Sequence, residues 1–149
     1  MPVIFQFEGE TLKGLIDYVL IDHHKKLIYP YDLKTLYRQS EFQNNFFRFG
    51  YWIAIALYTS GLKVWAEENG MKDYTVKPLG FLGVSTSFFE APLITLTRDE
   101  QYVKCMDGFD GRKGLIEIVQ DIRYHKEKGF WDMTVEEHKK NGITIIDFI

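Results

Sequence analysis

The chain has 149 residues, a formal net charge of −3 and one cysteine, within an ordinary globular balance of hydrophobic and charged residues. This length suits one domain with a sizeable core, so we predict a single domain over residues 1–149. The absence of a basic run disfavours general nucleic-acid binding, because that function needs clustered Lys and Arg to neutralise phosphates. A lone cysteine excludes an intrachain disulfide.

The cysteine count and the N-terminal residues together favour a cytoplasmic protein. A reducing compartment fits a chain that has only Cys105. The first ten residues, MPVIFQFEGE, lack the basic start and long apolar core of a secretory signal. Aromatic residues make up 16% of the chain. Two interpretations are open: the rings pack in the core, or some of them form a binding surface.

The first forty residues are predicted to be mostly helical after one strand. Val3–Phe7 is short, apolar and rich in β-forming residues, which indicates a strand. Glu10–His23 is predicted to be an amphipathic helix, since its apolar residues recur at helical spacing. Asp32 is expected to cap a short helix over Leu33–Gln39.

The stretch Glu41–Asn69 predicts one long central helix that is apolar on almost every side. We expect it to be buried, with bends at Gly50 and Gly61, because glycine weakens a helix interior. Its uncharged run, Phe49–Leu62, is shorter than the roughly 20 residues needed to cross a bilayer. A core helix is therefore expected, and no membrane segment.

The second half of the chain changes to β-forming residues separated by turn residues. The predicted strands are Tyr74–Pro78, Phe81–Ser85, Leu93–Thr97, Tyr102–Met106 and Ile143–Ile149. The segment Arg98–Gln101 has the length of a hairpin connection. Two further helices are predicted, Lys113–Lys128 and Val135–Lys140, and the second follows a capping box formed by Thr134 and Glu137.

The segment Asp107–Gly114 comes nearest to a functional motif. Glycines at three-residue spacing precede a predicted helix, where free amide groups and two cations favour an anion. The candidate ligand-binding residues are Gly108, Asp110, Gly111, Arg112, Lys113 and Gly114. The spacing matches neither the phosphate-binding Walker loop nor the dinucleotide fingerprint, so an ordinary strand-to-helix turn is the main alternative. Asp107 and Asp110 alone do not make a metal site.

The remaining reactive side chains do not form a catalytic pattern. His23 and His24 are adjacent, so they point about 100° apart on a helix, while His125 and His138 stand alone in their segments. Cys105 is expected to be a buried small residue. Ser85 and Ser87 lack the second glycine of a nucleophile elbow. We therefore assign no catalytic residue, no metal and no cofactor.

These patterns predict an α+β fold with a mixed or mostly antiparallel sheet. The sheet packs on the long helix and on two or three flanking helices. The first functional hypothesis is a small non-enzymatic inhibitor, of the immunity or anti-defence kind, that binds a basic protein partner, because its acidic surface would steer such a partner. The alternative is a small enzyme or ligand-binding protein that holds a phosphate or nucleotide at Asp107–Gly114, with Asp110 or a histidine as acid or base.

Overall fold

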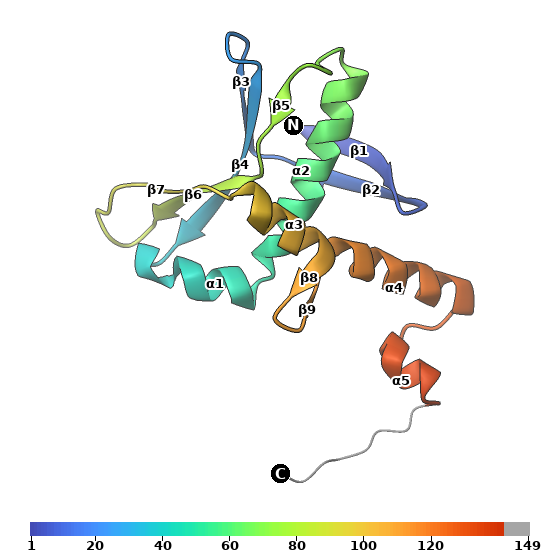
Figure 1. Cartoon of the computed structure of the whole chain (residues 1–149). Coiled ribbons are helices and arrows are strands. Elements are labelled where there is room, and N and C mark those ends of the chain that lie inside the picture. Colours follow the sequence, from blue (N-terminus) through green and yellow to red (C-terminus); the bar gives the residue numbers. More distant parts are fainter. Residues whose placement is uncertain (142–149) are drawn as a thin grey trace.

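The computed structural model describes residues 1–141, and within them it confirms the α+β class (Figure 1). A mixed five-stranded sheet is accompanied by two antiparallel hairpins and by helices. The predicted strand Ile143–Ile149 lies outside the described residues. Among residues 1–141, no helix is both long enough and apolar enough to cross a membrane.

The N-terminal strand is confirmed, but the predicted helix Glu10–His23 is wrong. The chain instead forms the hairpin of β1 (Pro2–Phe7) and β2 (Glu10–Leu15), then turns into β3 (Tyr18–Asp22). Glu8 and Gly9 both have positive φ, as a two-residue hairpin turn requires. The apolar residues of this segment also fit one face of a helix. The backbone hydrogen bonds that residues 10–15 form with β1 make them a strand instead.

The predicted helix Leu33–Gln39 is also wrong, because these residues continue a long central strand. Strand β4 (Leu27–Leu36) pairs antiparallel with β3. Asp32 is buried within β4 and caps no helix. The turn between the two strands is held by Asp22, whose carboxylate accepts hydrogen bonds from the amides of His24 and Lys25.

Strand β4 is the central strand of the five-stranded sheet. It pairs in parallel with β5 (Thr75–Val76) and β6 (Gly80–Ser85), and β6 pairs antiparallel with β7 (Leu93–Thr95). The strand order is β3-β4-β6-β7, with β5 against β4. Three predicted strands of the second half therefore exist, although β5 and β7 are shorter than expected.

The long central helix exists, but it is broken at Gly50. A 3-10 turn, η1 (Gln39–Glu41), leads into α1 (Phe42–Arg48), and α2 (Tyr51–Glu68) follows. Gly50 takes the left-handed conformation at φ 67° and so separates the two helices. Gly61, the other expected bend, lies inside α2. Several α2 residues, among them Ile55, Ala56 and Leu62, are buried as predicted, whereas Phe47 of α1 and Phe49 of the α1–α2 connection are exposed.

Helices α1 and α2 cover one face of the five-stranded sheet, here called the inner face. Phe81 of β6 is buried there, and its ring lies 5.5 Å from that of Phe42 and 5.7 Å from that of Tyr51. Ile28 and Leu36 of β4 are buried on the same side. One hydrophobic cluster thus joins the sheet, the β1–β2 hairpin and helices α1 to α4.

The predicted strand Tyr102–Met106 is wrong, since these residues lie in α3 (Asp99–Asp107). The Gln101 side chain accepts a hydrogen bond from the Arg98 amide, and Asp99 and Glu100 occupy the first turn, where acidic residues suit the helix dipole. These start signals lie in the segment that was expected to be a hairpin loop. Tyr102 and Cys105 then face α2, with the Tyr102 hydroxyl 3.0 Å from that of Ser60.

The last two helices are confirmed as α4 (Leu115–Lys128) and α5 (Val135–Lys139). Helix α4 runs from the sheet region toward α5 in Figure 1. Arg123 of α4 donates a hydrogen bond to the Glu8 carbonyl at 2.9 Å, and Lys126 pairs with Glu10 at 2.5 Å. These contacts hold α4 against the β1–β2 turn.

Replacing Gly61 with alanine is expected to destabilise the protein, although alanine normally favours a helix interior. A Cβ at position 61 would lie 2.7 Å from the Phe5 ring and 2.8 Å from Val3. Overpacking of this kind costs about 1–3 kcal/mol, more than the roughly 0.5–1 kcal/mol that alanine contributes to helix propensity. Urea denaturation measures the difference. Combining Gly61→Ala with Phe5→Leu should recover part of the loss, and a single Gly61→Ala variant that is more stable than wild type would contradict this packing.

Candidate functional site

The side of the five-stranded sheet opposite α1 and α2, here called the outer face, carries mostly aliphatic and aromatic side chains over its centre, with Thr35 as a polar exception. Strand register places eight of them together, because residues paired across strands point to the same side. They are Tyr18, Leu20, Tyr29, Tyr31, Leu33, Leu82, Val84 and Ile94. When one face of a sheet meets water, the residues that point to that face are normally polar, but most of those on this outer face are apolar.

Several outer-face side chains are largely exposed to solvent. The exposed fractions are 53% for Tyr18, 52% for Leu33 and 63% for Ile94. Leu20 and Val84 are exposed as well. Contiguous exposed apolar surface of this kind is uncommon on proteins that act alone and usually marks an interaction site.

The outer face is hollowed beside Tyr31. A cavity of about 190 Å³ lies between Tyr31, Leu96 and the segment Lys77–Gly80. Gly80 makes this possible, since a Cβ there would come within 3.0 Å of the Tyr31 ring and 2.9 Å of the Thr95 carbonyl. The face therefore offers both a flat apolar area and a recess in which a partner side chain could anchor.

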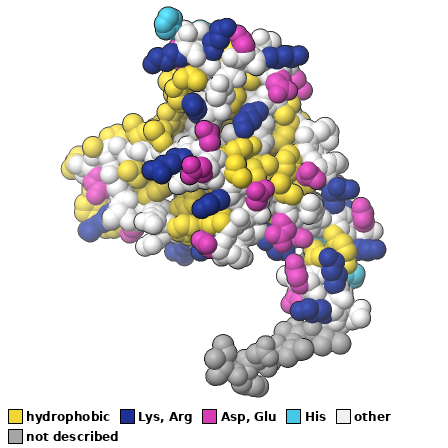
Figure 2. Space-filling model, viewed as in Figure 1, with side chains coloured by type: hydrophobic (Ala, Val, Ile, Leu, Met, Phe, Trp, Pro, Cys, Tyr) yellow, Lys and Arg dark blue, Asp and Glu magenta, His cyan; other side chains and the backbone are white. Residues whose placement is uncertain are grey.

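An exposed aromatic loop adjoins the same sheet, between β6 and β7. Phe89 has a relative exposure of 113%, so its ring has essentially no cover. Its neighbour Phe88 contacts Tyr37 edge to face at 5.3 Å and lies under the Arg38 guanidinium at 4.3 Å. Figure 2 shows hydrophobic side chains at the surface on the left, where Figure 1 places β6, β7 and their connection, and charges of both signs over the helices.

The inner face contains one charged cluster, formed by Asp17, Asp32, Lys34 and Tyr58. Asp32 is 6% exposed, and its carboxylate lies 2.6 Å from the Lys34 amine. Burial raises the pKa of Asp32, the Lys34 amine opposes that rise, and Asp17 adds to it. Burial also raises the pKa of Tyr58, and the Asp32 carboxylate adds to that rise. The Lys34 amine lies 4.5 Å from the centre of the Tyr51 ring, so α2 covers part of this cluster, whereas Asp17 is exposed.

The predicted anion segment Asp107–Gly114 forms a tight hairpin that leads into α4. Its strands are β8 (Gly108–Phe109) and β9 (Arg112–Lys113), and Asp110 and Gly111 make the turn with positive φ. The glycines serve close packing here, because a Cβ on Gly114 would meet the Met106 carbonyl at 2.3 Å. These consecutive residues lie together in the hairpin, but both of its cations have other partners in the structure.

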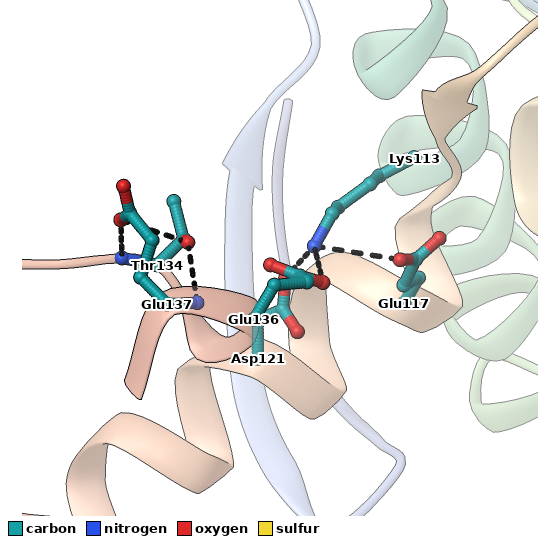
Figure 3. A network of polar contacts seen from close by, with 6 residues as sticks. All are labelled: Lys113, Glu117, Asp121, Thr134, Glu136 and Glu137. Atoms are coloured by element: carbon teal, nitrogen blue, oxygen red, sulfur yellow. Dashed lines mark hydrogen bonds and ion pairs between the residues drawn. The ribbon is translucent and has the colours of Figure 1, made fainter. Parts of the chain in front are cut away.

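Lys113 is the centre of an ion-pair network that joins α4 to α5 (Figure 3). Its amine lies 2.7 Å from Asp121, 3.0 Å from Glu136 and 3.4 Å from Glu117. The Asp121 hydrogen bond is the main reason that the pKa of Lys113 is raised well above its usual range. A phosphate that binds the Lys113 amine would have to compete with these three carboxylates, so Lys113 is a poor site for an added anion.

Arg112, the second cation of the predicted anion site, lies over aromatic rings. Its guanidinium is 4.9 Å from the Phe47 ring, 5.8 Å from Phe109 and 5.9 Å from Trp52. The Trp52 indole also donates a hydrogen bond to the Lys113 carbonyl at 3.1 Å. These contacts favour a structural role for the hairpin, and binding of a phosphate or nucleotide there stays a prediction with less support.

The other candidate residues of the sequence each have an individual structural partner. His23 is 2.9 Å from the Tyr74 hydroxyl, His138 is 2.6 Å from that of Tyr124, and His125 donates to the Phe130 carbonyl at 2.6 Å. The Ser85 hydroxyl donates to the Tyr37 carbonyl. Cys105 is buried, which raises the pKa of its thiol to about 11. Within residues 1–141, no three His, Cys, Asp or Glu side chains are grouped as metal ligands would be.

Sequence reasoning missed the outer face because it assigned two of its strands to helices. Tyr18, Leu20 and Leu33 were placed in predicted helical segments, and only Leu82, Val84 and Ile94 in strands. One signal was available: the apolar runs 18–22 and 27–31 flank the polar segment His23–Lys26, which is the pattern of a hairpin.

Comparison with known proteins adds no relative to this description. No protein-family model matches the chain, and a search of curated proteins returns no match.

The buried carboxyl group of Asp32 should make stability depend on pH. Because its folded-state pKa is raised, the folded protein holds this proton more tightly, and stability falls as pH rises through that pKa. Asparagine removes this dependence. We therefore expect the unfolding free energy of Asp32→Asn minus that of wild type to increase from about pH 3.9, the usual aspartate value, toward neutral pH. Urea denaturation across this range measures it, and a difference that decreases with pH would contradict the assignment.

Proposed function

We propose that this protein is a small non-enzymatic binding protein that acts on a protein partner through the outer face of its sheet. The observation that supports this most directly is the uncharged set of eight apolar and aromatic side chains on that face, several of them exposed. Interfaces concentrate aromatic and aliphatic groups at their centres and exclude charge there.

The chemistry of the face favours a partner with an apolar centre. Tyr18 and Tyr31 provide rigid rings, with centroids 6.3 Å apart, and rings of this kind are common binding hot spots. Leu33 and Ile94 supply aliphatic area that becomes favourable when it leaves water. The recess beside Tyr31 would accept one side chain of the partner.

The net charge favours a basic partner. At −3 the protein attracts a positively charged protein at long range, which raises the association rate without changing contacts in the apolar centre. This is the arrangement expected of an inhibitor-type protein that blocks a basic target. A second copy of the same chain would meet a like charge, so we favour a different protein.

The function is tested by placing a charge on the outer face. Leu33→Asp should weaken partner binding roughly 30-fold, or about 2 kcal/mol, because the carboxylate would be buried in an apolar interface. Ile4→Asp is the matched control, since Ile4 is also largely exposed, at 68% against 52% for Leu33, but belongs to the β1–β2 hairpin. Proteins captured by wild type and by Ile4→Asp, but lost with Leu33→Asp, are purified and titrated by calorimetry.

Three results bear on this proposal. Loss of affinity with Leu33→Asp alone, together with slower association at high salt, would support it. A purified partner that binds wild type and Leu33→Asp equally would contradict use of the outer face. If sedimentation shows a wild-type dimer that Leu33→Asp dissociates, the occupant is a second copy and the proposed foreign partner is wrong.

A further inference from the structure

A second cavity lies on the helical side of the molecule, away from the outer face. Its volume is about 260 Å³, and it is partly open to solvent and lined by residues of α1, α2 and α3, of strands β6, β7 and β8, and of the segment following β7. An engineered apolar cavity of roughly 150 Å³ is known to admit benzene. This cavity is therefore large enough for one ring with a substituent or for two fused rings.

Aromatic side chains make up most of one wall. Phe46, Phe47, Phe81 and Phe109 all contribute, and Ile55 and Leu96 complete the apolar part. Phe46 contacts Phe81 at 6.0 Å and Phe47 at 5.2 Å, both nearly edge to face. Such pairs hold one another in place and present ring edges and faces, a surface that prefers an aromatic guest.

The polar side of the cavity carries one charge, and it is positive. Thr95, Thr97, Gln101, Lys104 and Cys105 form this side, and no Asp or Glu belongs to the lining. The Thr97 hydroxyl donates to the Leu79 carbonyl, and the Gln101 carbonyl oxygen is used by the Arg98 amide. Lys104 is exposed, and among residues 1–141 no carboxylate lies within ion-pair distance of its amine.

A second cation lies close to the same aromatic wall. Arg112 stacks on Phe47 and Phe109, two of the lining rings, at 4.9 and 5.8 Å. The cavity thus combines an apolar interior with Lys104, the one charged residue of its lining, while Arg112 lies behind its aromatic wall and Asp107 and Asp110 lie nearby in the hairpin. One free amine matches one negative charge, whereas a nucleoside triphosphate would need several cations and more volume.

We propose that this cavity binds a small aromatic carboxylate. The ring lies among Phe46, Phe81 and Phe109, and the carboxylate accepts a hydrogen bond from the Lys104 amine. This inference does not rest on the proposed protein-binding function, because the outer face and the cavity share only Leu96 and Thr97, which line both the cavity and the recess beside Tyr31.

The probes are 1-naphthoate and its uncharged analogue 1-naphthalenemethanol, titrated into the full-length protein by calorimetry. The carboxylate should bind at one site, and roughly tenfold more tightly than the alcohol, because a hydrogen bond to a charged group adds affinity. Lys104→Ala should remove this preference and leave the weak binding of the alcohol. Phe109→Ala should weaken both probes.

Lys72→Ala is the control, since Lys72 is exposed and lies outside the cavity lining. It should leave both affinities unchanged. The single thiol, Cys105, gives a second readout: bound naphthoate should slow its reaction with methyl methanethiosulfonate in the wild-type protein but not in Lys104→Ala. Absence of saturable naphthoate binding to wild type, or binding that Lys104→Ala and Lys72→Ala reduce equally, would overturn the proposal.

Discussion

The close approach of α2 to the β1–β2 hairpin is the constraint on which the rest of the structure depends. It exists because two glycines face aromatic rings: Gly61 of α2 lies against Phe5, and Gly14 of β2 lies under Tyr58. A Cβ at position 14 would come within 2.6 Å of the Tyr58 ring. With the hairpin held this close, α2 bridges it to the five-stranded sheet, and Leu62 and Ala56 become fully buried between them.

Because α2 packs on the inner face alone, the two faces of the five-stranded sheet are chemically different. The inner face receives the rings of α1 and α2 and even encloses a charged pair, Asp32 with Lys34. The outer face keeps its apolar side chains in water, a cost that the fold itself does not offset. The partner proposed above would remove this face from water. The aromatic cavity beside α3 belongs to the helical side and does not depend on the outer face.

Elements whose start and stop signals lie within their own residues were predicted from the sequence, whereas elements fixed by pairing with distant strands were missed. Helix α4 and the Thr134 cap of α5 were found because their start and stop signals lie in the sequence itself. The segment 10–23 fits a helix and two strands equally well, and only pairing with β1 and β4 resolves it. Helix α3 was missed because its β-forming residues, Tyr102 and Val103, outweighed its acidic first turn. The sequence placed the glycine-rich segment before α4, but it could not show that Lys113 is surrounded by carboxylates, one of which comes from Glu136, 23 residues away.

The central claim is that α2 covers one face of the sheet and leaves the other open. Hydroxyl-radical labelling of the purified protein, read residue by residue by mass spectrometry, tests this most directly. The account predicts strong labelling of Tyr18, Leu33 and Phe89, and protection of Phe81, Ile28 and Leu62. Equal protection of both sets in a protein shown to be monomeric would mean that another part of the chain covers the outer face, and would contradict the account.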